Sequence, residues 1–333
     1  MKKILLLGTG GTIASEMTPS GLSPALTSEQ LLAYVPEISE ICDVDCIQLF
    51  SIDSTNMQPE NWLKLAEALR THYDAYDGFV ICHGTDTMAY TAAALSYLVQ
   101  GSPKPIVLTG SQKPISFDST DSKTNLLDSF HYAASDACGV TIVFNGRVIL
   151  GTRARKTRSK SFKAFSSINY PDLAVLQNGY LMEYIRCECS EKPVFYDRLD
   201  PSVAVLKLIP GVDAGLLSFM LDRYDAVIIE SYGVGGLPTY AGAGFVEAVK
   251  DAVARGKTVV MTTQVQNEGS ELTVYSTGFN LKHYLNMLEA YDMTTEAAVA
   301  KIMWILGQTR DRGEIHRLFY TPVSHDIFRR KEP

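Results

Sequence analysis

The segment GFVICHGTDTMAYTAAALSYLV, at residues 78–99, contains one strand, one polar loop and one helix in succession. Its wholly apolar run Phe79–Ile81 predicts a buried strand over residues 78–82. The polar residues HGTDTM, 83–88, lead into a helix that we expect over residues 86–99, with three consecutive alanines near its centre. Because parallel strands need a crossover between them, a strand followed by a helix indicates a parallel sheet.

The same alternation continues on both sides of this segment. Short apolar runs predict further strands at residues 3–7, 44–52, 105–109 and 140–144. Stretches with helical periodicity predict helices at residues 28–35, 59–73 and 122–135. The predicted fold class is therefore α/β, with a larger N-terminal domain built on a mostly parallel sheet in three layers.

A second, smaller α/β domain is expected after an interruption. With 333 residues the chain is long for a single hydrophobic core. The alternation lapses between residues 168 and 201, where Tyr, Pro, Asn and charged residues gather without a helical period. We expect an N-terminal catalytic α/β domain at residues 1–187, a linker at 188–203 and a C-terminal α/β domain at 204–333. Its expected strands and helices cover residues 204–208, 214–221, 226–230, 241–255, 258–262 and 296–306.

Composition argues against several classes of partner. The hydrophobic fraction of 46% and the charged fraction of 20% are typical of a globular protein. The formal charge is −7 and the densest basic run, residues 153–160, is short, so we expect no nucleic-acid partner. The first apolar run stops at Gly8, which is too short for a signal peptide or a membrane span. We therefore expect no membrane partner and a cytoplasmic location.

The six cysteines are expected to be reduced thiols that pack as ordinary small apolar side chains. They stand at positions 42, 46, 82, 138, 187 and 189, without the paired spacing of a zinc site. We expect neither a metal nor a disulfide from them.

Four polar loops follow predicted strands, at the edge where parallel sheets bind ligands. Each contains small or hydroxyl-bearing residues bounded by glycine or by a helix start. The loops are GTGGTIAS at residues 8–15, DSTNM at 53–57, HGTDTM at 83–88 and TGSQKP at 109–114.

The first loop combines glycine at positions 8, 10 and 11 with Thr12. These glycines permit close backbone approach and can leave N–H groups around the Thr12 hydroxyl, where they would favour an oxyanion. A dinucleotide-binding loop would need glycine where Ile13 stands, and no Walker lysine follows. A tight turn that Thr12 merely caps is the alternative.

The third loop carries the sharpest chemical signal. Asp86 can bind a substrate ammonium, Thr85 can hold a water or join an oxyanion site, and Ser54 of the second loop can hydrogen-bond a carboxylate. Helix capping is the alternative, but it accounts for only one residue of such a cluster.

A hydroxyl nucleophile also needs a proton acceptor, which a buried lysine can provide. The candidate is Lys156 in GTRARKTRS, although a basic run of this kind is more often on the surface. The isolated histidines His83, His131 and His316 are expected to cap or pack rather than transfer protons.

Two of these segments together are similar to the signatures of a known family. TGGTIA at residues 9–14 with HGTDTM at 83–88 closely resembles the paired signatures of the bacterial L-asparaginases. DSTNM, TGSQKP and the lysine segment RARKT, 153–157, fall in that family's order and spacing, so the resemblance covers essentially the whole chain. The cytoplasmic type I branch is the one that it resembles, since no export signal is present.

The resemblance implies an amidohydrolase that converts L-asparagine to L-aspartate and ammonia through a threonine nucleophile and a β-aspartyl enzyme. It implies no metal or organic cofactor, a homodimer or homotetramer, and the allosteric binding that type I members show. The catalytic positions that it implies are Thr12 as primary nucleophile, with Thr85, Asp86 and Lys156 as the second catalytic group. The substrate-binding positions that it implies are Gly11, Asp53, Ser54, Thr55, Gly84, Thr85, Asp86 and Ser111.

The chain departs from the family pattern in the loop after TGGTIA. Many members place a tyrosine there beside the nucleophile, whereas residues 15–26 read SEMTPSGLSPAL. The missing tyrosine leaves three alternatives. Another residue helps to activate Thr12, or Lys156 activates Thr12 through Thr85, or the loop serves only to position the substrate. The family's second domain also supplies an acid to the neighbouring subunit's site, for which Glu268 or Glu271 is the candidate.

Four other functions compete with an asparaginase. A glutaminase or an enzyme of mixed specificity differs by one methylene of substrate, worth about 1–3 kcal/mol. The related amidotransferase subunit that acts on aminoacylated tRNA is expected to have an extra N-terminal domain. A catalytically silent asparagine sensor would use the same loops to bind its ligand. A nicotinamide dehydrogenase is the weakest alternative, because this chain lacks the third glycine of a dinucleotide-binding loop.

Overall fold

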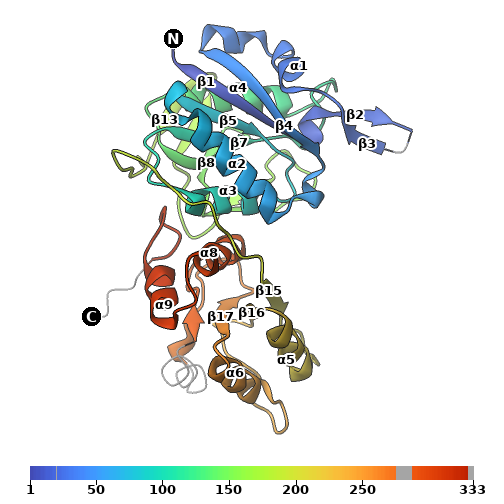
Figure 1. The fold of residues 1–333 in the computed structure, drawn as a ribbon. Coiled ribbons are helices and arrows are strands. Elements are labelled where there is room, and N and C mark those ends of the chain that lie inside the picture. Colours follow the sequence, from blue (N-terminus) through green and yellow to red (C-terminus); the bar gives the residue numbers. More distant parts are fainter. Residues whose placement is uncertain (20, 275–286, 329–333) are drawn as a thin grey trace. The chain divides into compact units, whose positions relative to one another are not determined.

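The computed structural model describes residues 1–19, 21–274 and 287–328. The chain divides into two compact units, Met1–Asp197 and Arg198–Pro333 (Figure 1). All four polar loops and the lysine segment belong to the first unit.

The first unit is built on an eight-stranded sheet with the order β13-β12-β9-β8-β7-β5-β1-β4. Its strands are β1 Lys3–Gly10, β4 Asp43–Ile52, β5 Gly78–Cys82, β7 Pro105–Thr109, β8 Gly139–Phe144, β9 Arg147–Leu150, β12 Ala174–Gln177 and β13 Tyr180–Glu183. The five strands from β8 to β4 pair in parallel, and the other three pair antiparallel at one edge. The predicted large, mostly parallel sheet is confirmed.

Helices cover both faces of this sheet. They are α1 Ser28–Ala33, α2 Pro59–His72, α3 Met88–Leu98 and α4 Ser122–Ala133. On one face, Leu31 of α1 and Phe130 of α4 share an apolar cluster with Ile4 of β1. Helices α2 and α3 contact each other on the opposite face, which Figure 1 shows toward the viewer. The unit therefore has the predicted three layers.

The strand order places the crevice of the sheet between β1 and β5. From β1 the chain crosses to β4 on one side and then to β5 on the other. Successive connections thus diverge at this point, which leaves a crevice at the carboxyl ends of the two strands. The loops that follow β1 and β5 are the two most glycine- and threonine-rich loops of the sequence, and the first contains the short 3-10 helix η1, Thr12–Ala14.

Three short antiparallel pairs complete the first unit. They are β2 Ser15–Thr18 with β3 Gly21–Pro24, β6 Val99–Gln100 with β14 Val194–Phe195, and β10 Ala154–Lys156 with β11 Phe165–Ser167. The loop without tyrosine after TGGTIA is thus a β2–β3 hairpin. The lysine segment is likewise a paired strand.

The expectation of irregular structure between residues 168 and 201 is wrong for residues 174–183. There β12 and β13 form an antiparallel hairpin that extends the large sheet. Its turn is Asn178–Gly179, with φ of 52° and 77°. Two positive φ values are what a tight hairpin turn requires, and Asn-Gly is the residue pair that adopts them most readily.

The second unit is the predicted smaller α/β unit, with a four-stranded parallel sheet in the order β15-β16-β17-β18. Its strands are β15 Val203–Lys207, β16 Ala226–Ser231, β17 Thr258–Thr263 and β18 Leu288–Glu289. Its helices are α5 Ala214–Arg223, α6 Phe245–Ala254, α8 Thr295–Gln308 and α9 Arg312–Tyr320. Helix α6 begins later than the predicted residue 241 because Gly242 and Gly244 have φ of 81° and 70°, which a continuous helix excludes.

The core of the second unit holds a fully buried ion pair. Lys301 Nζ of α8 and Asp326 Oδ2 are 2.6 Å apart, and both side chains are 0% exposed. Lys301 also donates to the Thr321 carbonyl, which fastens the C-terminal residues to α8. Among the described residues, none of the helices has the length and apolar character needed to cross a bilayer.

Candidate active site

The loops that follow β1 and β5 touch through two glycines. Gly11 has φ of 81°, and a Cβ placed on it would lie 2.4 Å from both the backbone nitrogen and the Cα of Gly84. The Gly11 N–H also donates to the Ile52 carbonyl at the end of β4, at 3.0 Å. No side chain fits between these loops, so glycine at position 11 permits their contact.

The second and fourth loops pack against the same point. A Cβ on Gly84 would lie 2.6 Å from Ser54 Oγ, and one on Gly110 would lie 2.1 Å from the His83 carbonyl oxygen. The His83 N–H donates to the Thr109 carbonyl at 2.8 Å. All four polar loops therefore meet at the carboxyl edge of the sheet.

Thr12 is presented at the start of η1. Gly11 precedes it as the N-cap, and the buried side chains of Ile13 and Ala14 anchor the turn in the core. The Ser15 hydroxyl donates to the Gly11 carbonyl at 3.0 Å. Thr12 itself is partly exposed, and its hydroxyl has no hydrogen-bond partner among the residues that the structure describes. The hydroxyl is thus available to a ligand.

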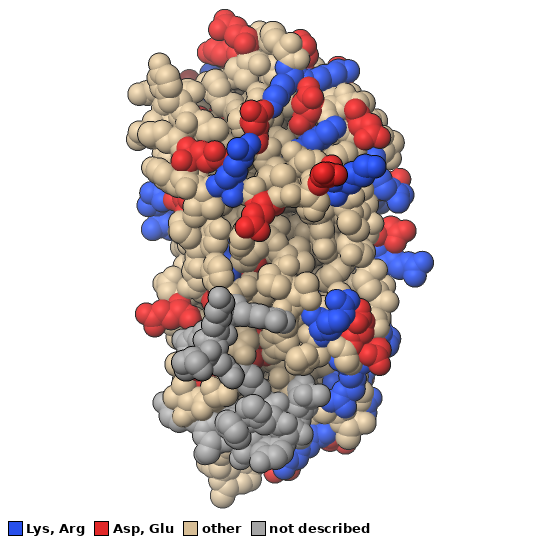
Figure 2. Space-filling view, turned by 90° about the vertical axis from the view of Figure 1, so that its left-hand side faces the viewer, with Lys and Arg blue, Asp and Glu red and all other residues tan. Residues whose placement is uncertain are grey.

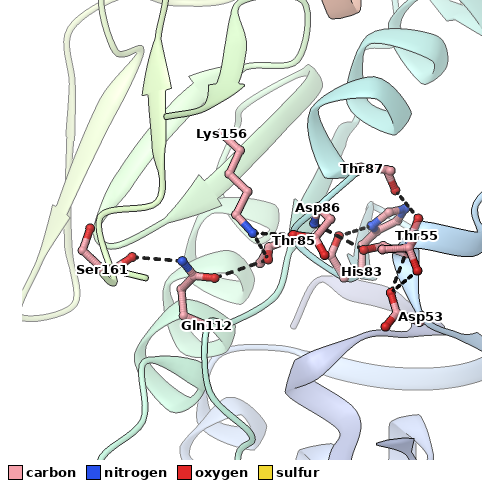
Figure 3. Close-up of polar contacts among 11 residues, drawn as sticks. Asp53, Thr55, His83, Thr85, Asp86, Thr87, Gln112, Lys156 and Ser161 are labelled. Carbon is pink, nitrogen blue, oxygen red and sulfur yellow. Dashed lines mark hydrogen bonds and ion pairs between the residues drawn. The ribbon is translucent and has the colours of Figure 1, made fainter. Parts of the chain in front are cut away.

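Lys156 reaches this site from β10. Its ammonium donates to Thr85 Oγ1 at 2.8 Å and to Asp86 Oδ1 at 2.7 Å, as Figure 3 shows. The Lys156 side chain is only 17% exposed, whereas that of Asp86 is 56% exposed. The alternative of a solvated surface lysine is therefore wrong for this residue, while the Asp86 carboxylate remains open to a ligand.

Ser54 lies against the same loop. Its Oγ accepts the Asp86 N–H at 3.2 Å, and its carbonyl accepts the Thr87 hydroxyl at 2.8 Å. Asp53 and Thr55 are engaged with each other, because Asp53 Oδ1 accepts both the N–H and the hydroxyl of Thr55 at 2.9 Å. These two side chains hold the local turn, whereas Ser54 Oγ packs against Gly84.

Gln112 belongs to the site although it was not among the residues singled out. Its Oε1 accepts the Thr85 hydroxyl at 3.4 Å, and its Nε2 donates to the Ser161 carbonyl at 3.2 Å (Figure 3). The Asp121 carboxylate holds the Gln112 N–H at 3.0 Å. Ser111, which was singled out, is buried, and its hydroxyl turns back to the Lys113 carbonyl. The sequence signal that could have identified Gln112 is its position within the polar loop TGSQKP.

Comparison with protein families matches both units of the chain. Residues 3–186 match the family described as "Asparaginase, N-terminal", and residues 202–319 match the "Glutaminase/Asparaginase C-terminal domain". The chain belongs to the asparaginase family. Its similarity to this family's type I branch, inferred from the sequence, is confirmed by the relatives that it matches.

Three relatives of this chain include two asparaginases and one amidotransferase subunit. The chain is 38% identical to the L-asparaginase of Thermococcus kodakarensis over 98% of this chain and 99% of that protein. It is 35% identical to L-asparaginase 1 of Escherichia coli over 95% of each. It is 36% identical to a subunit of the glutamyl-tRNA(Gln) amidotransferase of Pyrococcus furiosus, over 97% of this chain and 76% of that protein.

Solved asparaginase structures share the fold. The thermostable L-asparaginase of Thermococcus kodakarensis superimposes with a TM-score of 0.92, at 37% identity, over 98% of this chain and all of that one. The chain is accordingly a hydrolase that acts on the carbon–nitrogen bonds of amides.

His83 is a packing residue within the cluster of polar loops. Its ring is buried, with Nδ1 2.6 Å from the Gly84 carbonyl and Nε2 2.9 Å from the Thr91 hydroxyl. The Trp62 indole donates to the same hydroxyl at 3.0 Å. Burial lowers the pKa of His83 to about 4, so the ring is neutral at physiological pH. The expectation that His83 packs rather than transfers protons agrees with this setting.

A cavity of about 530 Å³ in the first unit lies apart from the asparaginase loops. It is lined by residues of β4 and α2 together with residues 195–197, and none of the predicted site residues contributes to it. Glu268 and Glu271, the candidates for an acid given to a neighbouring subunit, lie in the second unit beyond β17, and Glu268 has φ of 75°.

Proposed function

We propose that this chain hydrolyses L-asparagine to L-aspartate and ammonia through a covalent β-aspartyl intermediate on Thr12. The observation that carries the proposal is the contact of Lys156 with both Thr85 and Asp86, at 2.8 and 2.7 Å, beside the closely packed Gly11 and Gly84. Small glycine-lined walls, two hydroxyls, one lysine and one exposed carboxylate suit a short zwitterionic amide.

Recognition of a free amino acid is assigned to two side chains. The exposed Asp86 carboxylate would face the α-ammonium, because an opposite charge at contact distance stabilises both groups. Ser54 Oγ, which already accepts the Asp86 N–H, is placed to donate its own hydrogen to the α-carboxylate. A substrate lacking either charge would lose a charge-assisted hydrogen bond.

In the first half of the reaction, the Thr12 oxygen attacks the side-chain amide carbon, the Thr12 hydroxyl proton passes to the amide nitrogen, and the carbon–nitrogen bond breaks to release ammonia. Backbone N–H groups of the loops that follow β1 and β5 are assigned to the oxyanion, since these two loops meet beside Thr12. The Thr12 hydroxyl, without a partner among the described residues, loses no existing bond on attack.

In the second half, water attacks the β-aspartyl ester and restores the Thr12 hydroxyl. Proton transfer to and from this water is assigned to Thr85 with Lys156, since their 2.8 Å hydrogen bond provides a path for the proton. Asp86 holds the lysine in place through its 2.7 Å ion pair. Each protein group ends the cycle as it began.

The same proposal includes a homodimer or homotetramer and a cytoplasmic location. The open site of a single chain, with Asp86 more than half exposed, leaves room for a residue such as Glu268 or Glu271 of a second copy. The six free cysteines suit a reducing compartment. Acidic and basic side chains are interspersed over the described residues of the face in Figure 2, and the net charge is −7, which disfavours a polyanionic substrate such as tRNA.

Ammonia release from L-asparagine, L-glutamine and N-acetyl-L-asparagine tests this substrate assignment. We expect L-asparagine to be preferred over L-glutamine about 10- to 200-fold in kcat/KM, the range that one methylene allows. N-acetylation removes the ammonium that Asp86 would bind, so we expect kcat/KM to fall at least about tenfold.

Two outcomes would contradict the substrate assignment. Equal turnover of the acetylated compound would remove the role given to Asp86, and L-glutamine turned over as fast as L-asparagine would make the enzyme one of mixed specificity. Binding of L-asparagine without release of ammonia would favour a sensor.

A further inference from the structure

The loop at residues 110–113 is held to helix α4 by a buried network of hydrogen bonds. Asp121, the N-cap residue of α4, is 6% exposed, and Asn125, one turn later, is 1% exposed. An aspartate at this position ordinarily caps its own helix. The Asp121 side chain, however, makes no capping hydrogen bond to α4, all of which the structure describes. Its role must therefore be sought outside the helix.

The Asp121 carboxylate faces the loop. Its Oδ1 accepts the N–H groups of Gln112 and Lys113 at 3.1 and 3.2 Å, and its Oδ2 accepts that of Gln112 at 3.0 Å. Oδ2 also accepts a hydrogen from Asn125 Nδ2 at 3.2 Å. An ionised carboxylate suits this position because both of its oxygens are acceptors.

The carbonyl groups of the same loop are held by the next residues of α4. Asn125 Nδ2 donates to the Gly110 carbonyl at 2.9 Å, and Ser122 Oγ donates to the Lys113 carbonyl at 2.6 Å. Asn125 Oδ1 accepts the Asn145 N–H, just after β8, at 2.8 Å, which fixes the orientation of the amide. The loop backbone is thus fastened at both of its ends.

Gln112 connects this network to the candidate active site. Asp121 binds its backbone, while its side chain accepts the Thr85 hydroxyl at 3.4 Å and donates to the Ser161 carbonyl at 3.2 Å (Figure 3). Thr85 in turn accepts from Lys156 at 2.8 Å. A hydrogen bond as long as 3.4 Å depends on exact placement, because a small shift of the Gln112 backbone would break it.

We propose that Asp121 and Asn125 are positioning residues for the amidohydrolase, which hold Gln112 where it directs the Thr85 hydroxyl. The proposal rests on the proposed function, in which Thr85 takes part in proton transfer. Asp121 acts through the backbone that it binds. Its replacement should therefore lower kcat and change KM less, since the charged ends of the substrate are bound by other residues.

A double-mutant cycle with Gln112→Leu separates this role from a general loss of stability. Asp121→Asn keeps the shape of the side chain and replaces one acceptor oxygen with a donor, so we expect kcat with L-asparagine to fall about fivefold. In Gln112→Leu the same substitution should cause no further loss, whereas independent effects would multiply to about 25-fold. Asp311→Ala, which removes the capping bond to the Glu314 N–H of α9, is the control for lowered stability and should retain wild-type kcat.

Hydrogen exchange provides a readout that does not depend on ammonia release. In Asp121→Asn the amide hydrogens of Gln112 and Lys113 should exchange at least about fivefold faster than in the wild type, because both lose a carboxylate acceptor. Asp311→Ala should leave their exchange unchanged. Ser122→Ala, which removes one bond to the Lys113 carbonyl, gives the same two comparisons if Asp121→Asn does not fold.

The two measurements distinguish failure of this inference from failure of the proposed function. Unchanged exchange at Gln112 and Lys113, or losses of kcat that multiply in the double variant, would overturn the positioning role. A wild type that released no ammonia from L-asparagine would contradict the proposed function. Hydrogen exchange would then still decide whether Asp121 holds the loop.

Discussion

His83 links the hydrogen bonds of one residue to the stability of the whole domain. Its ring is buried between the Gly84 carbonyl and Thr91, and its pKa is lowered to about 4 from the ordinary value of 6.5. Between these two values the unfolded chain binds a proton that the folded chain does not. Protons therefore favour the unfolded state, and the free energy of unfolding must fall as pH falls from about 6.5 to 4.

Replacement of His83 by glutamine should remove this contribution. A difference of about 2.5 pKa units corresponds to about 3 kcal/mol, so the loss of stability between pH 7 and pH 4 should be smaller by about that amount in His83→Gln. Denaturant unfolding at a series of pH values measures it, with the exposed His316→Gln as control. An unchanged pH slope in His83→Gln would show that the buried ring is not the cause.

Gln112 sets the direction of the Thr85 hydroxyl hydrogen. The hydroxyl donates to Gln112 Oε1 and accepts from Lys156, so both partners define its orientation. In Gln112→Leu we expect kcat to fall about fivefold with KM changed less, since one hydrogen bond worth about 1 kcal/mol is lost at a reacting group. Steady-state kinetics with L-asparagine measure this. Gln100→Leu, which loses a side-chain bond to the Tyr97 carbonyl outside the site, should retain wild-type kcat.

At the scale of elements, the loops after β1 and β5 are joined by backbone contact and not by side chains alone. Their sequences predicted that glycine would allow close approach, because three glycines stand before Thr12. The sequence of the loop after β1 does not reveal which other loop would contact it. It follows from the strand order, which puts β1 beside β5.

Gly11→Ala tests the contact, and Gly139→Ala is its matched control. Both glycines have positive φ, 81° and 76°, but a Cβ on Gly139 meets nothing within 4 Å. Gly139→Ala should therefore cost only the conformational penalty of about 1–2 kcal/mol and retain activity. Gly11→Ala adds a clash with the backbone of Gly84 and should abolish ammonia release. Comparable kinetics in the two variants would mean that the loops can separate without harm.

Other elements show where a sequence pattern was sufficient and where it was not. Phe79–Ile81 was predicted because it is a wholly apolar run, and the helix that follows was predicted because it is rich in alanine. The β12–β13 hairpin was missed because its strands are short, lie at the edge of the sheet and alternate weakly, although Asn178–Gly179 marked the turn. The start of helix α6 was predicted too early, because the sequence does not reveal that Gly242 and Gly244 have positive φ.

At the scale of the whole molecule, alternation of strands and helices was enough to predict two α/β units and a site at the carboxyl edge of the larger one. The roles of Lys156 and Gln112 depend on distances across 71 and 27 residues of sequence, which no local pattern contains. The family resemblance drew attention to the lysine because RARKT matches a family motif. Gln112 lay inside a matched motif but had no assigned role.

The most direct test of Thr12 as the nucleophile is ammonia release from L-asparagine by the wild type, Thr12→Ala and Thr12→Ser. We predict rapid release by the wild type and a loss of at least about 10³-fold in kcat for Thr12→Ala with L-asparagine still bound. Thr12→Ser, which keeps a hydroxyl, should retain partial activity. Near-normal kcat in Thr12→Ala, at an unchanged unfolding temperature, would contradict the assignment of Thr12 as the nucleophile.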